Sequence, residues 1–195
     1  MNSLIILALQ APCVIFATTL HEFTRAFVST KLGDNRPRDN GRLTLNPFKH
    51  FEPIGFLLAL LTGFGWGLPV ETSSLYYKDR KKGTLLTAVL PTVSNLVAAA
   101  VFGILIKAVD VDNYYIYILL LGLISKNVAI AVYNIVPITP MDCLKVLSVA
   151  MPANSYFKYI QYEKIIQMVF LLALFMGYTN IIFAPIINII TNLLT

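Results

Sequence analysis

Residues 18–27 read TTLHEFTRAF and place three ionisable side chains, His21, Glu22 and Arg25, at the end of a largely apolar run that begins at Ser3. Side chains three and four positions apart lie on one face of a helix, so these three share a face. Ionisable groups at membrane depth are costly and usually mark functional sites. This stretch therefore connects the class of the fold with a candidate site.

The composition indicates an all-α polytopic membrane protein. Of the 195 residues, 57% are hydrophobic and 13% are charged, whereas soluble domains are about 45–50% apolar and about 25% charged. We expect one membrane-embedded domain over residues 1–195, with no linker, internal repeat, removable signal peptide or disulfide framework.

Four segments are long enough to cross a bilayer, which requires about 20 helical residues. They are residues 3–32, which end at Gly33, then 84–106, 114–136 and 165–195, the last of which contains Gly177 and Pro185 as points where it can break. We predict about four transmembrane helices, with the N-terminus outside.

The apolar segment Ile54–Trp66 has a different character. Its 13 residues would rise only about 20 Å as a helix. Basic residues flank it on both sides: Lys31, Arg36, Arg38, Arg42 and Lys49 before it, and Lys78, Arg80, Lys81 and Lys82 after it. Because basic loops stay in the cytoplasm, we predict a re-entrant or surface hairpin. Irregular backbone at that depth implies a polar cavity.

A second polar stretch, NIVPITPMDC at residues 134–143, follows the third predicted span. Pro137 and Pro140 prevent a regular helix there, and Asp142 falls on the same side of the membrane as His21. In the pattern H-E-x-x-H, two histidines one turn apart bind zinc and the glutamate is the general base. His21, Glu22 and Asp142 are therefore candidates for first ligand, base and third ligand, with Arg25 at the position of the second histidine.

These motifs, taken in order, resemble the site-2 protease family of intramembrane zinc metalloproteases, in its small bacterial form. The matching stretches are LHEFTRAFVSTKLGD, GRLTLNPFKHFEPIG, GFGWGLPV, VSNL and NVAIAVYNIVPITPMDCLKVL. The resemblance implies a multi-pass protein of the bacterial cell membrane, zinc held by His21 and Asp142, and Glu22 as the catalytic base. Asn95, Asn127 and Asn134 either form hydrogen bonds between helices or, as the resemblance implies, position an extended substrate.

Several motif positions depart from the family. Arg25 replaces the second histidine, Cys143 to Lys145 replace Gly-Gly-Arg, and Pro91 and Thr92 replace Gly-Pro. A guanidinium cannot ligate zinc, since it stays protonated, and each unit of repulsion at about 4 Å costs about 4 kcal/mol at an effective dielectric constant near 20. We expect zinc to be absent or weakly bound, with Arg25 paired to Glu22 and Asp142.

Two functions remain open. One is a catalytically impaired homologue that binds transmembrane helices without cutting them. The other is an active zinc metalloprotease that cleaves membrane-embedded helices near the cytoplasmic face, in which Cys143 or His50 completes the ligand set. A transporter would call for an inverted repeat, which the sequence lacks. The net charge of +5 is assigned to orientation signals and the lipid bilayer, not to nucleic acid.

Overall fold

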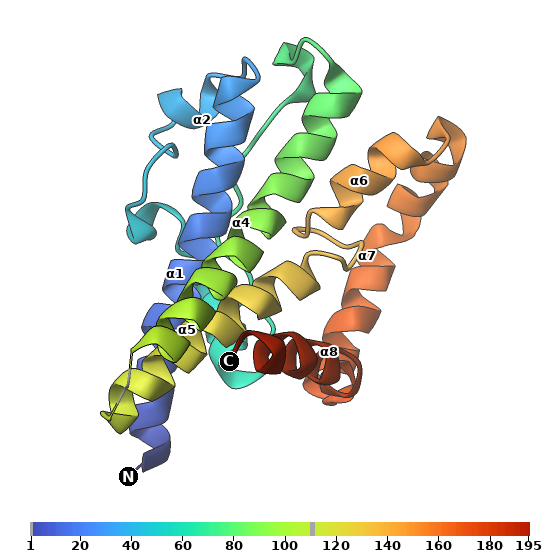
Figure 1. Cartoon of the computed structure of the whole chain (residues 1–195). Helices are drawn as coiled ribbons and strands as arrows, with labels where there is room; N and C mark the ends of the chain where they lie inside the picture. Colours follow the sequence, from blue (N-terminus) through green and yellow to red (C-terminus); the bar gives the residue numbers. More distant parts are fainter. Residues whose placement is uncertain (1, 110–111) are drawn as a thin grey trace.

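A computed structural model gives the structure of residues 2–109 and 112–195, and these residues form helices and connecting loops without a strand (Figure 1). The all-α prediction is therefore confirmed. The elements in chain order are α1 (Asn2–Lys31), α2 (Arg36–Asp39), the 3₁₀ turn η1 (Pro47–Lys49), α3 (Pro53–Leu61), the 3₁₀ turn η2 (Ser74–Tyr76), α4 (Arg80–Ala108), α5 (Tyr114–Tyr133), α6 (Cys143–Ala150), α7 (Ala153–Phe175) and α8 (Tyr178–Leu194).

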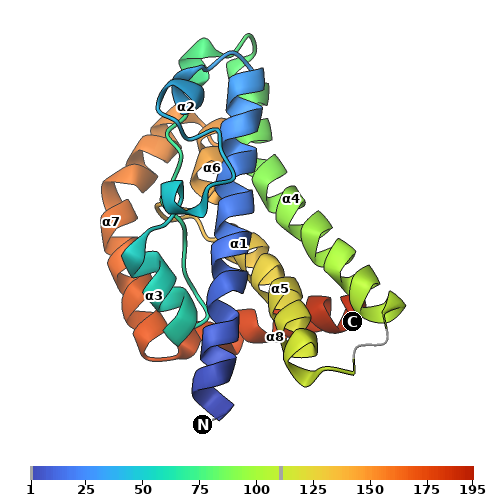
Figure 2. The same ribbon diagram turned by 90° about the vertical axis from the view of Figure 1, so that its left-hand side faces the viewer.

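Helices α1, α4 and α5 form the centre of the molecule, where they pack against one another (Figures 1 and 2). Within the described residues, these three helices are long and apolar enough to cross a membrane. The side chain of Asp79 caps α4 by accepting a hydrogen bond from the backbone N–H of Lys82 at 3.0 Å, which satisfies a donor that helical pairing leaves free. Helices α1, α4 and α5 correspond to the first three predicted spans.

The fourth predicted span, residues 165–195, is not a single helix. Helix α7 ends at Phe175, and Gly177 then adopts a left-handed φ of 80° before α8 begins at Tyr178. Glycine ends helices in this way because it lacks the Cβ that makes positive φ costly. Pro185 lies inside α8, so the break falls at Gly177. In Figure 1, α8 runs across the end of α7 and does not continue it.

The segment around α3 forms the predicted hairpin. Its two ends meet where the backbone N–H of Leu68 donates to the carbonyl of His50 at 2.8 Å. The two arms are in close contact, because a Cβ on Gly55 would lie 2.3 Å from the carbonyl oxygen of Trp66. Near its tip, the buried Phe64 ring packs against Tyr133 with ring centroids 4.6 Å apart. The hairpin is thus fixed to α5; its depth in the membrane stays a prediction.

A polar stripe on α7 holds the proline-rich loop after α5. Tyr159 donates to the carbonyl of Pro137, Glu163 accepts from the backbone N–H of Thr139 at 2.7 Å, and Gln167 donates to the carbonyl of Thr139 at 2.7 Å. The three side chains are four residues apart and therefore share one face of the helix. They fix the backbone that leads into Asp142.

Candidate functional site

Two distant parts of the chain form one buried polar cluster. His21, Glu22 and Arg25 project from α1, and Asp142 comes from the loop before α6; their exposed fractions are 3%, 4%, 2% and 2%. The Nε2 atom of His21 lies 3.0 Å from Oδ2 of Asp142. The predicted meeting of the HEFTR segment with the proline-rich loop is therefore confirmed.

The orientation of His21 follows from its neighbour Asn95 on α4. The Asn95 amide nitrogen donates to the carbonyl of Ala17 at 2.9 Å and to Oδ1 of Asn127 at 2.8 Å, so its Oδ1 is left as the acceptor for His21 Nδ1 at 2.8 Å. We therefore assign a proton to Nδ1. The other ring nitrogen, Nε2, then faces Asp142 and Arg25 and can accept from the second amino group of Arg25 at 3.2 Å.

Arg25 joins both carboxylates of the cluster. One amino group donates to Oε1 and Oε2 of Glu22 at 2.8 and 2.7 Å. The other donates to Oδ2 of Asp142 at 2.8 Å and lies 3.2 Å from His21 Nε2. The expected pairing of Arg25 with both carboxylates is confirmed. Charge-assisted bonds of this kind are the stronger hydrogen bonds in proteins.

The residues present do not fit a zinc ion in this arrangement. An ion shared by His21 and Asp142 would have to lie within about 2.2 Å of both ligand atoms, and the second amino group of Arg25 already contacts both atoms. Among residues 2–109 and 112–195, no three His, Cys, Asp or Glu side chains are placed to share a metal. His50 is fully buried, and its Nε2 is bonded to the carbonyl of Thr44 at 2.8 Å.

Glu22, the predicted base, also holds the returning arm of the hairpin. Its Oε2 accepts from the backbone N–H of Val70 at 2.8 Å, in addition to the bond from Arg25. Both carboxylate oxygens therefore accept charge-assisted or backbone hydrogen bonds. As placed, the carboxylate is a structural acceptor that ties α1 to the hairpin.

Asp142 is held from several directions. Burial alone would raise the pKa of its carboxyl, but the positive charges of Arg25 and Lys145 hold that pKa well below its usual range. Lys145 Nζ lies 3.2 Å from Oδ1. The backbone N–H of Asp142 donates to Oδ1 of Asn134 at 3.0 Å. Asp142 is therefore ionised and fixed in place.

The three predicted substrate-binding asparagines all lie near the cluster, where they make internal hydrogen bonds. Asn95 orients His21, Asn127 bonds Asn95 and the carbonyl of Leu123, and Asn134 bonds Asp142 and the carbonyl of Ile130. These contacts explain why amides occur here. A role in holding a substrate stays a prediction.

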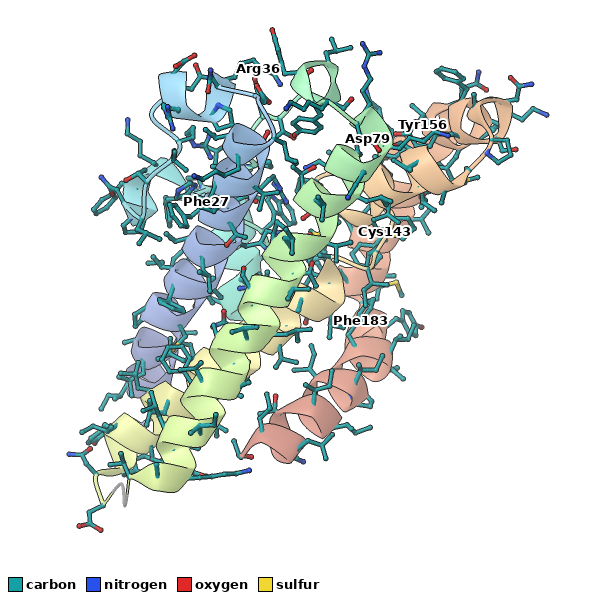
Figure 3. All side chains as sticks on the ribbon, turned by 45° about the horizontal axis from the view of Figure 1, so that its top comes forward. Phe27, Arg36, Asp79, Cys143, Tyr156 and Phe183 are labelled. Carbon is teal, nitrogen blue, oxygen red and sulfur yellow. The ribbon has the colours of Figure 1, made fainter. Side chains whose placement is uncertain are left out.

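A groove of about 440 Å³ extends from Arg25 along the hairpin arm. Its walls are residues 69–72 on one side and residues 139–141, Leu144 and Lys145 on the other. Cys143, labelled in Figure 3, begins α6 beside this loop. The buried cluster thus has a cavity next to it that is large enough for several side chains of another molecule.

The chain is similar to a known protein over most of its length. It is 29% identical over 183 residues to the Bacillus subtilis protein named "Putative zinc metalloprotease YwhC", covering 90% of this chain and 84% of that protein. This likeness fits a metalloprotease family. No family model matches the chain, and no solved structure matches it.

Proposed function

We propose that this chain is a site-2 protease-like membrane protein with impaired catalysis that binds transmembrane helices without cleaving them. The observation that carries the proposal is the position of Arg25, whose amino group contacts both His21 Nε2 and Asp142 Oδ2. A permanent cation attached to the chain there supplies the positive charge that the two carboxylates require.

Binding without cleavage is supported by the shape of the surroundings. The groove between residues 69–72 and the proline-rich loop persists beside the cluster, and the asparagine network that orients His21 is complete. A client helix would reach the groove with its end or with an unwound segment, because the walls are loops.

The alternative is an active zinc metalloprotease, and the name of the Bacillus subtilis relative favours it. Activity in this chain would require Arg25 to leave the cluster and a further ligand to replace it. Since Arg25 is 2% exposed and bonded to both carboxylates, we prefer the binding function.

The deciding experiment compares the natural chain with Arg25→His, and with Arg38→His as a matched control at an exposed arginine. Each purified protein is assayed for bound zinc and for cleavage of a fluorogenic transmembrane peptide in detergent micelles. We expect zinc and cleavage only with Arg25→His. Cleavage by the natural chain that disappears in Glu22→Gln would overturn the proposal in favour of the active enzyme.

Helix binding is tested separately by energy transfer between labelled protein and a labelled transmembrane peptide in bicelles. The natural chain is expected to bind the peptide and leave it intact. If neither binding nor cleavage occurs with several unrelated peptides, the binding function is wrong.

A further inference from the structure

The seam between α1 and α4 contains two cavities with different linings, whose nearest lining residues lie about one helical turn apart on each helix. The two helices lie side by side with the C-terminal end of α1 next to the start of α4 (Figure 1). At that end, a cavity of about 450 Å³ is lined by Lys31, Lys78 and Lys82, with Gly33 and Leu86 among its other walls. Farther along the seam lies an apolar groove of about 580 Å³.

The apolar groove is formed by one stripe from each helix. Helix α1 contributes Phe16, Leu20, Thr24, Phe27 and Val28. Helix α4 contributes Leu90, Val93, Ser94, Val97, Ala98, Val101 and Phe102. The Thr24 hydroxyl lies 2.8 Å from the carbonyl oxygen of Leu20 and 3.0 Å from the hydroxyl of Ser94, which itself donates to the carbonyl of Pro91 at 2.7 Å. Both hydroxyls therefore have partners within the protein. The remaining walls are hydrocarbon or aromatic.

The two cavities follow a single line along the helices. On α4, Lys82, Leu86, Leu90, Val93, Val97 and Val101 recur every three or four residues, which places them on one face. On α1, Lys31 stands over the ring of Phe27, with its Nζ 5.5 Å from the ring centroid. The stripe from Lys82 to Val101 rises about 28 Å at about 1.5 Å per residue, comparable to the hydrocarbon thickness of a bilayer.

The basic end has an excess of positive charge. The five ion pairs among the described residues include none of Lys31, Lys78 and Lys82. The one carboxylate in this lining belongs to Asp79, and it accepts the backbone N–H of Lys82 at 3.0 Å as the cap of α4. Figure 3 labels Asp79 at the start of α4 and Phe27 on α1. Three ammonium groups therefore face one carboxylate that already has a partner.

We propose that this seam is a binding site for one acidic phospholipid, with its phosphate among Lys31, Lys78 and Lys82 and an acyl chain in the groove between α1 and α4. A phosphate presents only acceptor oxygens, which suit ammonium groups, and basic clusters at a membrane surface attract anionic lipid. A neutral lipid would make no use of the lysines. A soluble phosphate would make no use of the groove.

The lysines are tested with Lys31→Gln/Lys78→Gln/Lys82→Gln, compared with Arg38→Gln/Lys49→Gln/Lys81→Gln, which removes the same charge from exposed positions outside the seam. The full chain is extracted from vesicles of equimolar phosphatidylglycerol and phosphatidylcholine, and retained lipid is counted by native mass spectrometry. Each lysine near the surface contributes about fivefold to binding, so we expect retained phosphatidylglycerol to fall at least tenfold in the first variant and less than twofold in the second.

The groove is tested with Ala98→Phe, which fills it without changing charge, and with glycerol phosphate as a competitor. We expect Ala98→Phe to reduce retained phosphatidylglycerol severalfold, and millimolar glycerol phosphate to displace none of it. Equal losses in both charge variants would overturn the proposal, as would unchanged retention in the lysine variant. Complete displacement by glycerol phosphate, or unchanged retention in Ala98→Phe, would show an anion site without a lipid groove and would also refute it.

Discussion

Replacing Arg25 with methionine removes the cation of the buried cluster and keeps most of its apolar volume. The side chain makes two bonds to Glu22, at 2.8 and 2.7 Å, and one to Asp142, at 2.8 Å. Removing one partner of a buried ion pair costs about 3–5 kcal/mol, because the remaining charge stays buried. Here two carboxylates are left, but Lys145 still faces Asp142 and the Val70 N–H still faces Glu22. We therefore expect a loss near that range and not twice as large.

The assay is reversible unfolding in mixed detergent micelles, with the free energy of unfolding compared across three variants. Arg38→Met changes an exposed arginine and should stay within about 0.5 kcal/mol of the natural chain. Adding Glu22→Gln to Arg25→Met should recover about 1 kcal/mol or more, since coupled neighbours typically show interaction energies of about 0.5–3 kcal/mol. A loss below about 1 kcal/mol for Arg25→Met would refute the idea that this arginine holds the cluster together.

Three further outcomes are expected. Burial opposes ionisation of Asp34, but hydrogen bonds from Arg36, Ser73 and Ser29 hold its pKa below the usual value. The stabilising contribution of this carboxylate is therefore complete above about pH 4 and is lost as pH falls through the lowered pKa. Asp34→Asn should accordingly flatten the acid side of a plot of unfolding free energy against pH. Glu163→Leu leaves the Thr139 N–H without its acceptor and should cost about 1–3 kcal/mol of unfolding free energy, whereas Glu163→Gln, which keeps a carbonyl acceptor, should cost much less. Gly55→Ala would place a Cβ 2.3 Å from the Trp66 carbonyl oxygen and should cost about 1–3 kcal/mol of unfolding free energy, as overpacking does. Ile54→Ala, at a residue that is 65% exposed, should change the unfolding free energy in detergent little.

The sequence predicted the candidate site well because charge and topology are strong signals in a membrane protein. Basic residues on both sides of Ile54–Trp66 required both loops to lie on one side, and the Leu68–His50 bond confirms the hairpin. The same reasoning placed Asp142 beside His21 across 121 positions of sequence. Arg25 then had two carboxylates within reach, and it bonds both.

Contacts made by the backbone were beyond prediction. Two sets of hydrogen bonds depend on the path of irregular backbone, which residue type alone does not determine. They are the bond from the Val70 N–H to Glu22 and the bonds between the proline-rich loop and Tyr159, Glu163 and Gln167 of α7. The last apolar segment was predicted as one span with Gly177 and Pro185 as its possible breaks, and residue type alone does not choose between the two positions. The left-handed Gly177 divides it.

Arg25 belongs to the same helix as His21 and Glu22, so the positive charge of the cluster does not depend on the free concentration of a metal ion. A bound metal stabilises a protein in proportion to the logarithm of its free concentration over its dissociation constant, so a metalloprotein's stability varies with the medium and falls when a chelator is added. The guanidinium is part of the polypeptide and is therefore present in every copy of the chain. The buried cluster of this chain should therefore assemble to the same extent in zinc-starved and zinc-replete cells.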